Sequence, residues 1–408
     1  MSNTGGRTRR EIMADAAKMA AAASVAGLAS CFPDVGGHWA PVCVDPDAGT
    51  SANVPAPRPV TPTVVEVSNP DSVDAKSIIQ PDAVAAMLDA GLAALAQQAA
   101  LFNATLPAPS AGALESAADT SDGDGGVGDA DAGAWGAGSD PNSPWRILLP
   151  GYRPGMRIGL KVNCLNQYLP TSPALVRAIV ASLRDKLGVD PGNIVVWDRR
   201  LDELKRHGKY SADDLAGAQL LGTILQTVQD GGVPETSSDG QPGYGDVISP
   251  TIECQSPRLS RILTDLTDIT INCPVLKTHG VSGVTAAMKN IYGVIDIPGN
   301  YHKPLLETAL PKLYALPKIR NSISLNICDA LIAVVNGDTD AAPNDSPKRI
   351  LLSQDPVALD SRALSLVNER RAAMSLAPVD TTVLRWIDNA VSRGLGTKNF
   401  SLVPLTTG

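Results

Sequence analysis

The sequence has few aromatic residues and no excess of basic ones. Phe, Trp and Tyr together make up 4% of its 408 residues, too few for the aromatic platforms of carbohydrate clefts or base-stacking surfaces. The formal net charge is −8, whereas phosphate backbones bind to basic faces. Both shortages argue against nucleic acid as a partner. A hydrophobic content of 44% nevertheless predicts a globular part with a sizeable core.

Cysteine is also scarce, and none of the six cysteines lies in a Cys-x-x-Cys pair. A zinc finger or a ferredoxin-like cluster therefore has no local support. Cys164, Cys273 and Cys328 lie in or beside expected core strands, where a free thiol packs as a small apolar group. Disulfides are compatible with an oxidising compartment. No cofactor follows from this pattern, and a bound metal ion stays an open alternative.

The sequence also lacks long apolar runs. The run from Met19 to Ser30 has about 12 residues, fewer than the roughly 18 that a membrane span needs, and we expect no other span. Arg9 and Arg10 precede it, so the N-terminus resembles a twin-arginine export signal. The sequence "LASC" ending at Cys31 resembles a lipobox, and ordinary cleavage nearby is the alternative. We expect a periplasmic protein or one anchored to the membrane by lipid at Cys31, with no other membrane contact.

The composition changes several times along the chain. Seven acidic residues and no basic ones lie between Glu115 and Asp140, in a Gly-rich stretch that is too polar to order itself. Its aspartates lack the spacing of a calcium loop. The expected divisions are a signal at 1–31, a Pro-rich tether at 32–62, a strand and helix of the core at 63–105, a disordered acidic insert at 106–144, and a main domain at 145–408.

From residue 145 onward, apolar strands alternate with amphipathic helices. This order predicts an α/β fold in one main domain, with a mostly parallel or mixed sheet, helices on both faces and Rossmann-like layers. Ligands bind such sheets beyond the carboxyl ends of the strands. The expected strands are 156–165, 193–198, 269–276, 323–335 and 349–354. The expected helices are 81–102, 172–188, 257–268, a helix following His279, 355–371 and 381–396.

Polar residues stand at the ends of several of these strands. Lys161 and Asn163 end the first strand, and Lys277 and His279 end the third. Charges are costly in a sheet buried on both faces unless they are paired or lie at a cleft. Two such lysines therefore indicate a cleft. Lysines whose ammonium groups reach solvent at a strand end, and a structural histidine, are the alternatives.

Three aspartates lie at similar positions. Asp329 is within a core strand, and Asp355 precedes Pro356 at an expected helix start, where it suits an N-cap as well as a ligand site. Asp360 follows one turn later and could instead pair with a nearby arginine or lysine.

The segment after His279 completes the candidate site. Gly280 and Gly283 free the backbone at an expected turn into a helix, whose first N–H groups would attract an anion such as phosphate or carboxylate. Lys289 and Asn290 lie on that helix, offset from its apolar stripe. The glycines match neither a Walker loop nor a dinucleotide fingerprint.

Three motifs carry a family resemblance: "GLKVNCL", "CPVLKTHGVSGVTAAMKNIYGVI" and "ICDALIAVVNGDTDAAPNDSPKRILLSQDPVALD". In this order they resemble the family called domain of unknown function 362, over roughly Val65 to Gly394. Ile291 and Tyr292 replace the usual residues before Gly293. Some members carry an appended iron–sulfur domain, for which this chain lacks the cysteines. The positions implied by the resemblance, without roles, are Lys161, Asn163, Lys277, His279, Lys289, Asn290, Asp329, Asp355 and Asp360.

Three functions fit these residues. The first is an exported enzyme on which three lysines hold a small anion, His279 is the acid or base, and Asp329 orients it or binds a metal. A lysine of lowered pKa could instead attack a carbonyl. The second is a non-catalytic surface lipoprotein that binds a ligand or metal. The third is a redox protein with a bound metal. The ligand-binding set is Lys161, Asn163, Asn290, Gly280, Gly283, Asp355 and Asp360.

Overall fold

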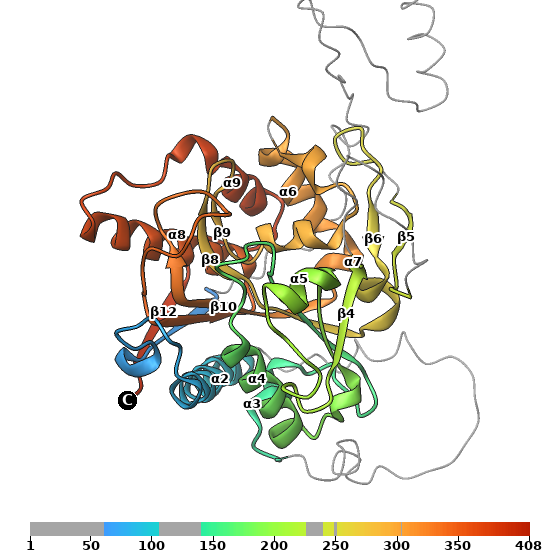
Figure 1. Ribbon diagram of the computed structural model, residues 1–408, viewed down its shortest axis with the longest axis vertical. Helices are drawn as coiled ribbons and strands as arrows, with labels where there is room; N and C mark the ends of the chain where they lie inside the picture. Colours follow the sequence, from blue (N-terminus) through green and yellow to red (C-terminus); the bar gives the residue numbers. More distant parts are fainter. Residues whose placement is uncertain (1–60, 106–139, 226–239, 249–250, 303) are drawn as a thin grey trace, which may run out of the picture.

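A ten-stranded mixed sheet forms the centre of the molecule (Figure 1). The computed structural model describes residues 61–105, 140–225, 240–248, 251–302 and 304–408. The expected export signal with Cys31 and almost all of the tether and of the acidic insert lie outside them. The sheet runs in the order β12-β1-β11-β10-β7-β2-β3-β4, and β8 pairs with β10 and with β9. Its strands are β1 (Thr63–Ser68), β2 (Ile158–Lys161), β3 (Ile194–Arg200), β4 (Gln219–Ile224), β7 (Ile269–Asn272), β8 (Val275–His279), β9 (Gly283–Thr285), β10 (Ile323–Val334), β11 (Arg349–Ser353) and β12 (Ser401–Thr406).

The sheet is parallel through its centre and antiparallel near one edge. β4, β3, β2, β7 and β10 run parallel to one another, whereas β11 is antiparallel to both β10 and β1. A separate pair, β5 (Tyr244–Val247) and β6 (Arg258–Ser260), lies outside the sheet. The parallel centre brings the carboxyl ends of β2, β3 and β7 to one edge, where an α/β sheet binds ligands.

Helices cover both faces of the sheet, as the alternation of strands and helices predicts. In β3, Ile194 and Val196 belong to one apolar core, and Val195 and Trp197 belong to the other, because successive side chains point to opposite faces. The first core includes α2 (Pro81–Thr105), α3 (Pro144–Leu148) and α4 (Pro173–Ser182). The second includes α6 (Leu306–Ala315), α7 (Pro317–Arg320), α8 (Pro356–Ala373) and α9 (Arg385–Ser392).

Short helical segments connect these layers. They are η1 (Pro70–Ser72), η3 (Leu183–Leu187), η4 (Pro191–Asn193), α5 (Leu201–Arg206), η5 (Ile262–Leu266), η6 (Lys289–Val294), η7 (Pro298–Tyr301) and η8 (Thr381–Val383). The expected helix at 172–188 is confirmed as α4 continued by η3: Ser172 accepts a hydrogen bond from the Leu175 N–H, and Gly188 ends it at φ 73°. Asp355 caps α8 by accepting from the Ala358 N–H.

Two expected helices are wrong. The segment after His279 is a hairpin, in which β9 pairs antiparallel with β8 and Gly283 adopts φ 74°. The apolar spacing of this segment predicted one helix face. Val284, Met288 and Ile291 are all buried, but they do not belong to one helix. Residues 257–268 form the strand β6 and one π-helical turn, because β6 pairs with β5.

The expectation that no other segment is long and apolar enough to span a membrane is also wrong. Pro81–Leu101 in α2 is long and apolar enough to span a membrane by length and composition alone. In the structure Val84, Met87, Leu88 and Leu92 are buried against the sheet and α4, and a core helix passes the same test.

The cysteines of the described region pack as expected. Cys164, Cys273 and Cys328 are free and fully buried, and burial raises the pKa of each thiol. Cys254 is disulfide-bonded. The three buried thiols are therefore poor nucleophiles.

Candidate functional site

Lys161 is paired with a carboxylate at the carboxyl ends of β2 and β3. Its Nζ lies 2.7 Å from Oδ1 of Asp198 and 2.8 Å from the carbonyl oxygen of Val162, and its side chain is 1% exposed. The other oxygen of Asp198 accepts from the Cys164 N–H at 2.7 Å. A buried ion pair whose charges are matched and hydrogen-bonded has a structural role. The charge of Lys161 is therefore neutralised by Asp198 and does not need a bound anion.

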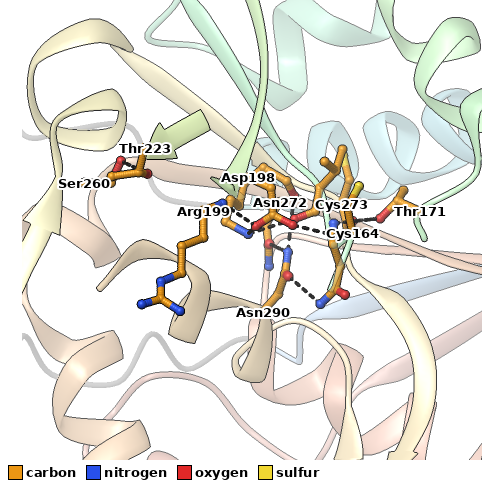
Figure 2. Close-up of polar contacts among 12 residues, drawn as sticks. Cys164, Thr171, Asp198, Arg199, Thr223, Ser260, Asn272, Cys273 and Asn290 are labelled. Carbon is orange, nitrogen blue, oxygen red and sulfur yellow. Dashed lines mark hydrogen bonds and ion pairs between the residues drawn. The ribbon is translucent and has the colours of Figure 1, made fainter. Parts of the chain in front are cut away.

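A chain of buried asparagine side chains crosses the same strand ends, and Figure 2 labels its two central members, Asn272 and Asn290. Asn163 donates to Oδ1 of Asn290 at 3.0 Å, Asn290 donates to Oδ1 of Asn272 at 2.8 Å, and Asn272 donates to Oδ1 of Asn326 at 2.9 Å. Asn290 also donates to the carbonyl oxygen of Lys161 at 3.2 Å. Each amide group is thereby fixed in one orientation.

Lys277 lies at one end of this chain. Its Nζ donates to Oδ1 of Asn163 at 3.2 Å, and its side chain is 1% exposed. Burial lowers the pKa of Lys277 to about 8. Within the described residues it forms no ion pair with a carboxylate, unlike Lys161.

Lys289 begins η6 and lies beside a histidine. Its Nζ is 3.2 Å from Nε2 of His302 and 3.7 Å from the ring centroid of Tyr292. The side chain is 7% exposed. Burial and, secondarily, the charge of Lys277 lower the pKa of Lys289 to about 7. In the part of the chain that the structure describes, Lys289 also has no carboxylate partner.

His279 and His302 stack on each other beside Lys289, with ring centroids 5.6 Å apart and planes at 16°. Nδ1 of His302 lies 3.0 Å from the carbonyl oxygen of Pro298, so it carries the proton, and Nε2 accepts from Lys289. Burial, followed by the charge of Lys289, lowers the pKa of both histidines, that of His279 to about 3.

His279 is a neutral hydrogen-bond donor and a weak base. Its Nδ1 accepts from the Val281 N–H at 3.0 Å and from the Ser282 N–H at 3.4 Å. The neutral ring therefore carries its proton on Nε2. The backbone N–H groups that the sequence assigns to an anion are thus occupied by His279 itself, because the segment is a hairpin and not a helix.

The glycines of this hairpin have separate roles. The Gly280 N–H donates to Oδ1 of the exposed Asp338 at 2.9 Å, and a Cβ at Gly280 would lie 2.7 Å from that carboxylate. Gly283 supplies the positive φ of the turn. Asp338 thus fixes the outer edge of the site next to His279.

The three expected aspartates do not contact His279. Asp329 accepts from the Ser172 and Leu331 N–H groups at 2.7 and 3.1 Å, so its expected role as the partner of His279 is not supported. Asp355 caps α8 and accepts from the Thr397 N–H. Asp360 accepts from the Ala287 and Met288 N–H groups at 2.6 and 3.0 Å and so positions the backbone before Lys289. Burial raises the pKa values of all three.

The structure thus brings six of the expected residues together, namely Lys161, Asn163, Lys277, His279, Lys289 and Asn290. It adds Asp198, Asn272, Asn326 and His302, which the sequence patterns did not select. An asparagine within an apolar strand, as in "ITINC" and "ISLNIC", was the available signal for two of them. Among the described residues, no group of three or more His, Cys, Asp and Glu side chains is arranged to hold a metal ion.

One surface depression, of about 620 Å³, lies away from this cluster. Lys205, Tyr210 and residues 217–220 at the start of β4 contribute to its lining, and none of the candidate residues does. It is therefore not part of the site.

Part of the chain matches a family model. Residues 158–365 match the family model described as domain of unknown function (DUF362). This range is narrower than the expected 65–394 but contains every residue of the cluster. No curated protein matches the chain.

Proposed function

The chain belongs to the DUF362 family, whose description assigns no function, and we propose from the geometry of its site that it binds a small anionic molecule. One observation supports the proposal. Lys277 and Lys289 are two buried amines without a carboxylate partner in the described part of the chain.

Lys161 is the comparison that shows why the missing carboxylates matter. All three lysines are buried, and Lys161 has Asp198 at 2.7 Å. A buried ammonium group without a counter-charge costs several kcal/mol, so it loses its proton or recruits an anion. A bound phosphate or carboxylate would supply the missing charge to both Lys277 and Lys289. Lys161 was expected to hold the anion as well, but its charge is paired with Asp198. The asparagine chain instead contributes to the site by orienting Lys277.

The histidines are the more exposed polar groups of the proposed site. His279 and His302 are half-buried, whereas the lysines beneath them are buried. The Nε2–H of His279 is a donor that can face an anion, because Nδ1 is occupied by backbone N–H groups. Neutral donors and lysine amines together form an anion site that also excludes cations.

Calorimetric titration tests the proposal. The full chain is titrated with inorganic phosphate, sulfate, acetate and succinate at pH 7. We expect at least one to bind, and Lys277→Met and Lys289→Met each to weaken it about tenfold or more. The matched control is Lys318→Met, which changes an exposed lysine of α7. The proposal fails if no anion binds, or if the control weakens binding as much as the site variants.

A proton-transfer enzyme is the second candidate, and the contact between Lys289 and His302 favours it. The amine and Nε2 are 3.2 Å apart, and the pKa of Lys289, about 7, suits a group that both takes and gives protons near neutrality. His279, with a pKa of about 3, is the weaker base. Its expected acid or base role passes in this proposal to Lys289 and His302.

We also propose, from the sequence alone, that the protein is exported through the twin-arginine route and lipidated at Cys31. Fractionation of cells that express the full chain tests this. Replacing Arg9 and Arg10 by lysine should retain the protein in the cytoplasm, and Cys31→Ser should release it from the membrane fraction without preventing export. A lipoprotein that only binds its ligand would show anion binding and no turnover.

A further inference from the structure

We propose that Lys289 is a nucleophilic amine that forms an imine with the carbonyl carbon of a small oxo acid, while Lys277 holds the carboxylate of the same molecule. This inference rests on the anion-binding function proposed above and names its substrate class.

The surroundings of Lys289 distinguish it from the other buried lysines. Lys161 is bound to a carboxylate, and Lys277 donates to the amide oxygen of Asn163. Lys289 contacts a ring nitrogen, Nε2 of His302, and the face of Tyr292. A carboxylate would keep the amine charged. A neutral imidazole leaves it free to lose its proton, and an uncharged amine is the form that attacks a carbonyl.

The orientation of His302 fits the role of base. Its Nδ1–H is fixed by the carbonyl oxygen of Pro298 at 3.0 Å, so the lone pair of Nε2 faces Lys289. Tyr292 is itself fixed, because its hydroxyl donates to the carbonyl oxygen of Tyr301 at 2.7 Å. The two groups around the amine, His302 and Tyr292, are therefore held in place before any substrate binds.

Lys277 and Lys289 suit two different ends of one molecule. Lys277 is deeper, 1% exposed, and is held by the ordered asparagine chain. Lys289 is nearer to the half-buried histidines. The positive charge of Lys277 also lowers the pKa of Lys289, the effect by which a neighbouring cation activates a lysine nucleophile. A carboxylate bound by Lys277 would bring an adjacent carbonyl toward Lys289.

The reaction balances without an oxidant. The nitrogen of Lys289 forms a bond to the carbonyl carbon, and the π electrons move to the oxygen. Nε2 of His302 takes one proton from the nitrogen and gives it to that oxygen, which yields the neutral carbinolamine. The carbinolamine nitrogen then loses its second proton to His302, its electrons form the C=N bond, and the hydroxyl group leaves as water with that proton. One amine and one oxo acid give one imine and one water.

Reductive trapping tests the proposal. The full chain is incubated with pyruvate or 2-oxoglutarate at pH 7.5, treated with sodium borohydride, and analysed by intact mass and peptide mapping. We expect one adduct, on Lys289, whose mass equals that of the oxo acid less one oxygen atom. Acetone, which lacks the carboxylate, should give at least tenfold less adduct at the same concentration.

Variants and a second readout separate this inference from the proposed function. Lys289→Arg cannot form an imine and should give no adduct, whereas the matched control Lys318→Arg, at an exposed position of α7, should give as much adduct as the wild type. Anion binding by the wild type without a trapped adduct, or adducts spread over exposed lysines, would refute the imine and leave the anion site standing. If no anion binds and no adduct forms, both proposals fail.

Discussion

Asp360 in α8 accepts a hydrogen bond from the backbone N–H of Met288, the residue before Lys289, at 3.0 Å. Its other oxygen accepts from the Ala287 N–H at 2.6 Å. One buried carboxylate thus joins α8 to the backbone that carries Lys289 and Asn290. The site is built on this link, because η6 has no side-chain cap of its own.

Replacing Asp360 by asparagine should weaken both the fold and the site. The amide oxygen can satisfy one backbone N–H, and the amide NH₂ then faces the other donor. We expect a loss of about 1–3 kcal/mol in the free energy of unfolding and weaker anion binding. Urea denaturation and calorimetry measure the two effects. The control Asp388→Asn changes an exposed carboxylate of α9, and an Asp360 variant no worse than this control would contradict the role of the link.

Lys277 and Lys289, which have no carboxylate partner among the described residues, should make the protein more stable as the pH rises from 7 to 9. Their pKa values, about 8 and 7 in the folded chain, lie below the ordinary 10.5. The unfolded chain therefore binds more protons in this range, and stability rises with pH. The double variant Lys277→Met, Lys289→Met should lose this slope. Urea denaturation at both pH values measures it.

Other groups titrate in the same range, so the wild type is compared with the double variant at each pH. Burial raises the pKa of Glu203 to about 8, which contributes a slope of the opposite sign to both proteins and cancels in the difference. An unchanged slope in the double variant would show that the lysines carry no burial cost.

The sequence predicted which residues lie at the strand ends of the site, but it did not predict which of them have a charged partner. Lys161 and Lys277 follow apolar runs, so their position at a carboxyl edge follows from the parallel order of the strands. Their difference depends on Asp198, a residue of another strand. No pattern along the chain shows that one lysine has a carboxylate beside it and the other an amide.

His302 and the hairpin after His279 were missed for a related reason. His302 lies in η7, and only the fold brings it to Lys289. In the hairpin, burial on all sides gives Val284, Met288 and Ile291 an apolar spacing that resembles one helix face. The long helices α2 and α8 were predicted correctly, because each has a proline in its first turn and Asp355 caps α8.

Sulfate should bind more tightly as the pH falls from 9 to 7. Its charge does not change in this range, whereas Lys277 and Lys289 take up protons near pH 8 and 7. We expect the dissociation constant to fall by about tenfold or more, as proton-linked binding requires. Calorimetry in two buffers of different ionisation enthalpy should also detect proton uptake. A dissociation constant that does not change with pH would show that these amines do not meet the anion.

Gly293→Ala should disturb the site through the ion pair beside it. A Cβ at Gly293 would lie 2.7 Å from Nζ of Lys161 and 3.1 Å from Oδ1 of Asp198. The lysine cannot withdraw easily, because it is buried and bound to both Asp198 and the carbonyl oxygen of Val162. We expect a loss of about 1–3 kcal/mol in the free energy of unfolding. In the control Gly151→Ala the new methyl group meets no atom within 4 Å. Equal stability of the two variants would mean that η6 can move away from β2, and the asparagine chain would then not be rigid.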